Sequence, residues 1–291
     1  MKTKLLKTAL LTSLFSASIL SGAIAAETVT VSGSTTVLPI MQKISESYMR
    51  EDPNVAIELS GGGSGSGIKG LSDGLTQVAM SSRKIKPEES KIAEKNKVQP
   101  YQTTVAIDAI VPIVHPNNKV PNISLDDLRK IYKGEIKNWK EIGGANAPIV
   151  LVSRDTSSGT YETWEELVMK KQRISPRALL QSSNGTVVQT VSKNPNAIGY
   201  IGFGYITPSI KAVDVNGIKA TSEAAADGKW PLSRELYLYT NGAPKGAVEK
   251  VIAYTLAPKG QKLIQETGFI PMKYEHHREG ASVPSLKNAH E

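Results

Sequence analysis

Short apolar runs rich in β-branched residues alternate along the chain with segments whose apolar residues recur at helical spacing. The runs TVTVSG, VAIELS and QVAMSS each have the length and composition of a strand. Between the first two, apolar positions repeat every three or four residues, at Val37, Ile40, Met41, Ile44 and Tyr48. Strands that alternate with helices in this way predict an α/β fold. In an open parallel sheet, ligands bind at the carboxyl ends of the strands.

One apolar run is too long for an ordinary strand. TTVAIDAIVPIVHP covers residues 103–116 and contains Pro112, which favours a bend or an edge position. A strand that leaves one lobe and enters another would have this length, and a return near Tyr200–Tyr205 in AIGYIGFG would make a second crossing. We therefore predict a two-lobed architecture with two hinge crossings. Its parts are a signal peptide (1–26), lobe I (27–105 plus 206–291) and lobe II (106–205).

The first residues have the features of a secretory signal. Three lysines precede an apolar stretch that ends in Ala23-Ile24-Ala25, a pattern that signal peptidase accepts after Ala25 or Ala26. A membrane anchor is the alternative, but hydroxyl residues interrupt the stretch and it is short for a span. The chain has no cysteine, so it offers neither a lipid-attachment site nor disulfides. We predict a periplasmic protein that is secreted through a cleaved signal and carries no lipid anchor.

Charge limits the choice of partner. The formal net charge of +8 includes the three lysines of the signal, which leaves a mild surplus of +5 in the mature chain. A surplus of this kind favours the approach of small anions. The basic residues are dispersed and are not interleaved with aromatic residues, so we do not expect nucleic-acid binding.

The stretch GGGSGSGIKG, residues 61–70, follows the second predicted strand directly. Glycine-rich turns that lead into helices let the backbone approach a ligand and present free N–H groups to an anion. A flexible Gly/Ser linker is the alternative, and this segment by itself does not decide between them.

The segment VSRDTSSGTYETW carries a stronger indication. Arg154 ends a predicted strand, and Ser157, Ser158, Gly159 and Thr160 occupy the turn where a helix begins. A guanidinium fork, hydroxyls and helix N-terminal N–H groups are together suited to a tetrahedral oxyanion. An ordinary N-cap beside a surface arginine is the alternative.

Taken in order, these motifs resemble the phosphate-binding proteins of bacterial phosphate-specific ABC transporters, which are type II periplasmic binding proteins. SGSTTV, GGGSGSG and SRDTSSGT carry the resemblance, together with AIGYIGFG, and it runs through essentially the whole mature chain. The resemblance implies phosphate contacts at Thr35, Thr36, Ser64, Arg154, Ser158, Gly159 and Thr160.

One position departs from that family. Where its best-known members place an aspartate that accepts the proton of hydrogen phosphate, this chain has Ser82 followed by Arg83. We include both in the predicted site, although the exchange puts strict selection of phosphate over sulfate in doubt, because sulfate has no proton to offer such an acceptor.

The function expected from the resemblance is binding of inorganic phosphate by lobe closure, in a monomer that delivers the anion to an ABC permease without cofactor or metal. Another oxyanion, such as sulfate or molybdate, is one alternative, and a scavenger without a permease is a second. A serine hydrolase or phosphatase using Ser64 or Ser158 is a third, but the chain lacks a G-x-S-x-G elbow. His276 and His277 form an adjacent pair in a charged tail, which is more typical of a solvated segment than of a metal site.

Overall fold

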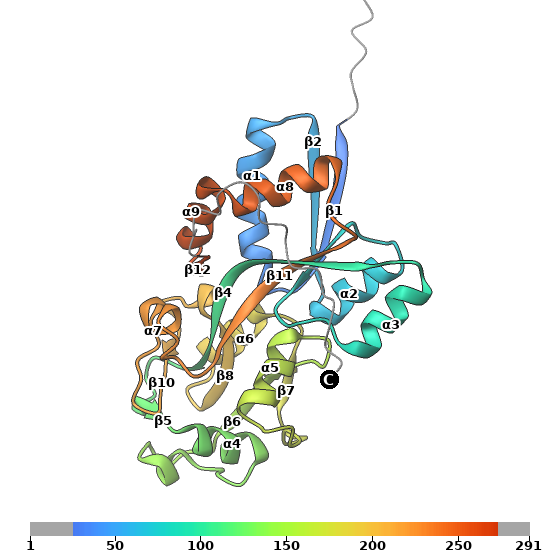
Figure 1. Ribbon diagram of the computed structural model, residues 1–291. Coiled ribbons are helices and arrows are strands. Elements are labelled where there is room, and N and C mark those ends of the chain that lie inside the picture. Colours follow the sequence, from blue (N-terminus) through green and yellow to red (C-terminus); the bar gives the residue numbers. More distant parts are fainter. Residues whose placement is uncertain (1–25, 273–291) are drawn as a thin grey trace, which may run out of the picture.

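The computed structural model describes residues 26–272, so the predicted signal peptide up to Ala25 and the pair His276–His277 lie outside the described residues. Two long strands run side by side through the molecule and join an upper and a lower lobe (Figure 1). They are β4 (Pro100–Val114) and β11 (Ser233–Asn241). The prediction of a two-lobed α/β fold with two crossings is confirmed.

Lobe I contains the N-terminal strands and the last helices (Figure 1). The predicted first helix is present, and its apolar stripe, including Ile40, Met41 and Ile44, is buried against the sheet. The elements of lobe I are β1 (Glu27–Gly33), α1 (Leu38–Glu51), β2 (Val55–Gly61), α2 (Ser64–Ser72), β3 (Val78–Ser81), α3 (Pro87–Lys95), α8 (Gly246–Leu256), α9 (Pro258–Glu266) and β12 (Ile270–Pro271).

Lobe II contains the middle of the chain. Its first helix begins at Ser124, whose Oγ accepts from the Asp127 N–H at 2.9 Å, and ends at Gly134, whose φ of 79° suits glycine. The elements of lobe II are β5 (Asn122–Ile123), α4 (Leu125–Lys133), β6 (Val150–Arg154), α5 (Gly159–Leu167), β7 (Leu179–Gln181), α6 (Asn184–Ser192), β8 (Ala197–Gly202), β9 (Lys211–Ala212), β10 (Asp214–Val215), α7 (Ser222–Ala226) and the 3-10 turns Trp139–Ile142 and Phe203–Tyr205.

One sheet passes through both lobes in the order β2-β1-β3-β11-β4-β8-β6-β7. Strands β1, β2 and β3 are parallel, whereas β11 and β4 are antiparallel to each other over nearly the whole length of β11. Their register shifts between Leu236 and Tyr237, which is a local irregularity in the crossing pair. Parallel strands end at the junction of the lobes, so the turns that follow them also meet there.

The second crossing differs from the sequence prediction. The run AIGYIGFG forms β8, which pairs with Ile110–Val114 in the lobe II half of β4 and stays in that lobe. The chain then continues in lobe II, because Ile210, Val213 and Trp230 pack into the same core as β8. The return to lobe I is made by β11, so residues 206–232, expected in lobe I, belong structurally to lobe II. An apolar run reveals a buried strand but does not reveal its pairing partner.

Candidate functional site

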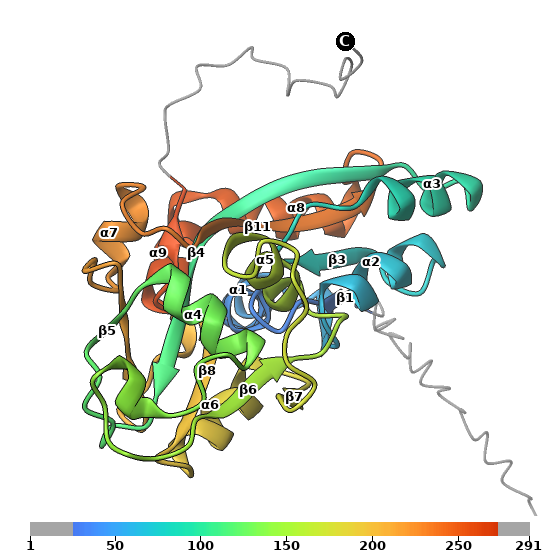
Figure 2. The ribbon, with the colours of Figure 1, turned by 90° about the horizontal axis from the view of Figure 1, so that it is seen from below.

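Three strand-to-helix turns meet where the lobes touch, and they carry the motifs singled out in the sequence. The turn after β1 brings Thr36 from lobe I, and the start of α5 brings Thr160 from lobe II. Their hydroxyl oxygens are 3.0 Å apart. The N–H of Gly65, in the glycine-rich segment, donates across the junction to the Ser157 carbonyl at 3.0 Å. In the view from below in Figure 2, α5 of lobe II overlaps α1 of lobe I near the centre of the molecule.

Two serine hydroxyls of lobe I lie directly opposite the first residue of α5. Ser64 and Ser82 are fully buried, their Oγ atoms are 3.3 Å apart, and the Ser82 N–H donates to Ser64 Oγ at 3.0 Å. A Cβ built on Gly159 would lie 2.4 Å from Ser64 Oγ and 2.7 Å from Ser82 Oγ. Glycine is therefore required at position 159 for the lobes to approach this closely.

Arg154 ends β6 and is 1% exposed. Its Nε donates to the Gln181 carbonyl and its Nη2 to the Ser182 carbonyl, each at 3.0 Å. The remaining nitrogen, Nη1, is buried and has no hydrogen-bond partner among residues 26–272. Burial lowers the pKa of the Arg154 guanidinium, and the nearby charge of Arg234 lowers it further. A buried donor of this kind is costly unless an acceptor reaches it.

Ser158 caps helix α5, because its Oγ accepts from the Tyr161 N–H at 3.3 Å. The first-turn N–H groups and the positive end of the helix dipole are directed at the junction, where they favour a negative charge. Asp155 is partly engaged beside Arg154, with its Oδ2 3.9 Å from Arg154 Nη2. Its Oδ1 accepts from the N–H and the hydroxyl of Ser157, at 2.9 and 2.5 Å.

Arg83 is placed differently from the other predicted contacts. Its Nη1 and Nη2 donate to the two oxygens of Glu89, each at 2.7 Å, and its Nε lies 2.5 Å from Glu162 Oε2 on α5 of the other lobe. Lys86 also reaches Glu162, at 3.0 Å. Burial lowers the pKa of Arg83, but the hydrogen bonds to Glu89 and the charges of Glu162 and Glu89 outweigh it and raise the pKa. Arg83 thus bridges the lobes beside the junction.

Burial raises the pKa of Glu162 above its usual range, in spite of the two cations beside it. The desolvation of this carboxylate therefore offsets much of the attraction within the cluster, as is common for partly buried ion pairs. The cluster of Arg83, Lys86, Glu89 and Glu162 joins the two lobes beside the junction.

Sequence reasoning missed a second group of polar residues at the junction. Asn184, the first residue of α6, donates from Nδ2 to the hydroxyls of Thr35 and Thr36, at 3.3 and 3.0 Å. Arg234 on β11 and Asp108 on β4 form a buried ion pair beside Thr36, with Arg234 Nη2 2.8 Å from Asp108 Oδ2 and 3.2 Å from Thr36 Oγ1. The available signal was an aspartate inside an otherwise apolar run, because a charge on a buried strand needs a partner.

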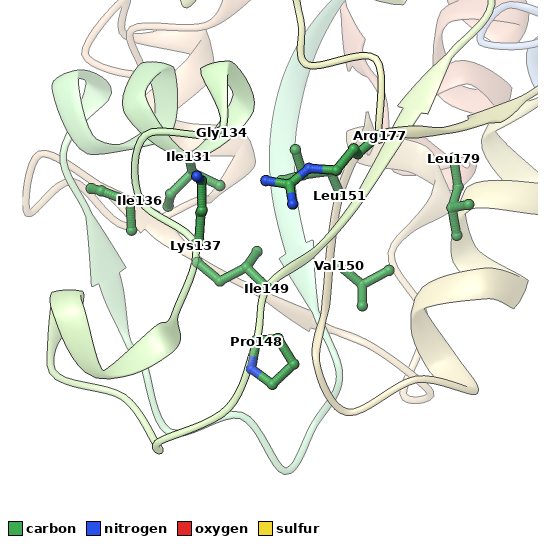
Figure 3. Close-up of a pocket in the computed structure, with 10 residues that line it drawn as sticks. All are labelled: Ile131, Gly134, Ile136, Lys137, Pro148, Ile149, Val150, Leu151, Arg177 and Leu179. Atoms are coloured by element: carbon green, nitrogen blue, oxygen red, sulfur yellow. The ribbon is translucent and has the colours of Figure 1, made fainter.

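Lobe II carries a hollow of about 280 Å³ (Figure 3). Ile131, Ile149 and Leu151 give it an apolar lining, and Lys137 and Arg177 extend over it (Figure 3). It holds none of the predicted contact residues. Within residues 26–272 no cluster of three or more His, Cys, Asp or Glu side chains is suited to a metal ion. Helices in the same range all fall short of the length and apolarity needed to cross a membrane.

Two lobes joined by two crossing strands, with a buried polar site between them, define a substrate-binding protein of the two-lobed periplasmic type. The model of the PBP superfamily domain matches residues 21–259. The phosphate-binding protein PstS of Borreliella burgdorferi is 33% identical over 257 residues, covering 84% of this chain and 90% of its own. PstS of Bacillus subtilis is 32% identical, covering 85% of this chain and 82% of its own.

Solved structures agree with these relatives. A phosphate ABC transporter substrate-binding protein with bound phosphate, from Clostridium perfringens, matches with a TM-score of 0.80 and 34% identity, covering 85% of this chain and 100% of its own. An ABC-type phosphate transport receptor from Vibrio cholerae matches with a TM-score of 0.68 and 32% identity, covering 83% and 99%. The chain belongs to the PBP superfamily and, within it, to the PstS family of phosphate-binding proteins.

Proposed function

We propose that this protein binds inorganic phosphate between its lobes and delivers it to the permease of an ABC transporter. The observation that carries the proposal is the buried junction of three strand-to-helix turns, where hydroxyls of Thr36 and Thr160 from the two lobes meet and Arg154, at the end of β6, keeps a buried guanidinium nitrogen without a partner among residues 26–272. The relatives named for phosphate binding, and the phosphate-bound structure from Clostridium perfringens, support the same ligand.

The proposed ligand set keeps the predicted residues except Arg83, whose donors are directed at carboxylates. Lobe I contributes hydroxyl or backbone groups to this ligand set. Lobe II contributes the Arg154 guanidinium and the first residues of α5. The residues are Thr35, Thr36, Ser64, Ser82, Arg154, Ser158, Gly159 and Thr160. Five or six hydrogen bonds to a charged ligand, at roughly 1.5–3 kcal/mol each, total about 7.5–18 kcal/mol, and the upper half of this range covers the ~8 kcal/mol of a micromolar dissociation constant together with several kcal/mol of ordering costs.

Closure follows from this division of donors. In the open form an anion contacts the donors of one lobe, which are about half of the ligand set. It therefore binds the closed form more tightly and shifts the population toward that form. A membrane permease can then recognise the phosphate-bound protein by its closed shape. We propose that the protein acts as a monomer in the periplasm, after removal of the signal peptide, and without a lipid anchor.

A hydrolase or phosphatase has less support. A serine nucleophile requires an adjacent general base. Within residues 26–272 the one histidine is His115, which follows β4 and accepts from the Asn117 N–H at 3.1 Å. Ser64 and Ser158 are engaged with Ser82 and the Tyr161 N–H instead. We therefore propose binding without catalysis.

The test is calorimetric titration of the ligand-stripped mature protein with phosphate, sulfate, molybdate and arsenate. Stripping by partial unfolding and refolding is needed because a tight binder would be purified with its ligand. We expect micromolar or tighter binding of phosphate and weaker binding of molybdate. Tightest binding of sulfate or molybdate would transfer the proposal to another oxyanion, and no heat with any of the four would refute it.

A further inference from the structure

Arg234 and Asp108 form an ion pair between the two crossing strands, directly beside the phosphate-binding residues. We propose that Arg234 is a second cationic ligand of the anion and that Asp108 is its positioning residue. Two guanidinium groups would then contact one ligand, which favours a tetrahedral oxyanion and, with the N-terminus of α5, the divalent form of it. This inference rests on the proposed function and adds a residue and a charge state to it.

Asp108 holds one edge of the Arg234 guanidinium. Its Oδ2 accepts from Nε at 3.0 Å and from Nη2 at 2.8 Å, and its Oδ1 accepts from the Phe203 N–H at 2.9 Å. The Asp108 side chain is fully buried and that of Arg234 is 6% exposed. Both oxygens of Asp108 are thus engaged, so the carboxylate orients the arginine and is not directed at an anion.

The other edge of Arg234 reaches the predicted ligands of both lobes. Nη2 donates to Thr160 Oγ1 at 2.9 Å and lies 3.2 Å from Thr36 Oγ1. These hydroxyls come from α5 in lobe II and from the turn after β1 in lobe I. An arginine with a purely structural role in the crossing strands would not need to contact the anion-binding turns of both lobes.

Arg234 also has a donor left over. Its Nη1 is buried and finds no hydrogen-bond partner within the part of the chain that the structure describes, which is also true of Arg154 Nη1. The positive charge of Arg234 is one of the causes that lower the pKa of Arg154, so the two guanidinium groups repel each other. Two unpaired donors on neighbouring buried cations are unfavourable unless an anion lies between them.

The positive groups of the junction are Arg154, Arg234 and the N-terminus of α5, against the one negative charge of Asp108. The three side chains alone sum to +1, so a dianion also needs the positive end of the α5 dipole. Because guanidinium groups bind oxyanions through two parallel N–H bonds, a tetrahedral ligand with several anionic oxygens can engage both. Hydrogen phosphate and sulfate have this charge, whereas dihydrogen phosphate carries one negative charge less.

The main experiment removes the whole ion pair, so that no unpaired charge is left buried. Replacement of a buried pair by apolar residues of similar volume is often neutral or stabilising, whereas removal of one partner is not. We expect Asp108→Val/Arg234→Met to bind phosphate about 10- to 100-fold more weakly than wild type by calorimetry, from the lost charge-assisted hydrogen bonds. Its thermal unfolding without phosphate should not fall below that of wild type.

A second variant keeps the charge. Arg234→Lys retains a cation beside Asp108 but loses the fork, and we expect about tenfold weaker phosphate binding with unchanged unfolding of the phosphate-free protein. Arg177→Gln, which removes an arginine over the lobe II hollow, is the matched control and should bind phosphate like wild type. The control separates contact with the ligand from a general loss of positive charge.

The charge state is tested by repeating the titrations at about pH 6 and about pH 8, between which phosphate loses its second proton. The titratable and charged groups around Arg234 are Asp108 on β4, Arg154 on β6, Tyr200 on β8 and the neighbouring Tyr205. Wild-type affinity should rise with pH, and the rise should be smaller in the double variant. Sulfate stays a dianion over this range, so a rise that appears with phosphate and not with sulfate comes from the ligand and not from ionisation of Asp108.

The outcomes separate the two proposals. If wild type binds phosphate and the dissociation constants of both variants lie within about threefold of its own at about pH 8, the ion pair has a purely structural role. That result would overturn this inference alone. An equal rise with pH in wild type and double variant would overturn the assignment of a dianion to Arg234. Wild type that binds neither phosphate nor sulfate would refute the proposed function itself.

Discussion

Gly159 provides the sharpest test of lobe closure. It begins α5 with helical backbone, so alanine is compatible there and gains up to about 1 kcal/mol in helix propensity. In the closed form the new Cβ would lie 2.4 Å from Ser64 Oγ and 3.1 Å from Ser64 Cβ, both in the opposite lobe. Rotation of the serine hydroxyl relieves the first contact but not the second. The lobes must therefore separate by several tenths of an ångström.

The magnitude follows from that overlap. Overpacking by one methyl group costs roughly 1–3 kcal/mol, and here it falls on the closed form only, because the open form separates the two lobes. We therefore expect Gly159→Ala to bind phosphate about 5- to 150-fold more weakly, with no loss of thermal stability in the phosphate-free protein. The weakening should appear as faster dissociation in stopped-flow measurements, since the encounter with one open lobe is unchanged.

Two other glycines serve as matched controls. A Cβ on Gly185, in the first turn of α6, would lie 3.7 Å from Ser183 Oγ, and one on Gly65, at the same junction, 3.5 Å from the Ser157 carbonyl. Both distances are ordinary contacts, so Gly185→Ala and Gly65→Ala should bind like wild type. The closure account would be refuted if Gly159→Ala bound phosphate within twofold of these controls.

The remaining predictions concern charge, selectivity and motion. Arg154→Ala should reduce phosphate affinity by at least about 100-fold in a folded protein, and Arg154→Lys should recover only part of it; affinity within a few-fold of wild type in the alanine variant would move the site elsewhere. Ser82→Asp should weaken sulfate binding more than phosphate binding in competition titrations, and an unchanged ratio would show that selectivity resides in another residue. Small-angle scattering should show a smaller radius of gyration with phosphate than without, and identical profiles would remove lobe motion from the mechanism.

The fold was predictable where periodicity and turn chemistry act locally. Strands β1 to β3 and helices α1 and α4 follow from apolar spacing and from caps such as Ser124 and Gly134. The second crossing was not predictable, because β8 and β11 are both apolar strands and only their pairing assigns them to a lobe. Pairing over long sequence separations depends on the whole sheet and leaves no short pattern in the chain.

The site divides in the same way. Residues at strand-to-helix turns were predicted because Gly, Ser and Thr at a helix start have a recognisable chemistry, and the structure brings Thr36, Ser64, Ser82 and Thr160 together. Arg234 was missed because it begins a strand and has no turn motif around it. Its proximity to these residues is created by the pairing of β11 with β4, which local sequence does not encode.

The carboxylates around the junction bear on how the protein would separate phosphate from sulfate. Glu162 faces Arg83 and Lys86, Asp108 is engaged by Arg234 and a backbone N–H, and Asp155 accepts from Ser157. Each of these anions already has donors of its own. Among the described residues, the groups that the proposed site offers to a ligand are therefore donors, or hydroxyls that can both donate and accept. A site of this composition recognises the charge and tetrahedral shape of a ligand strongly and a ligand proton weakly. The presence of Ser82 in place of the family's aspartate should therefore relax the selection of phosphate over sulfate without abolishing phosphate affinity.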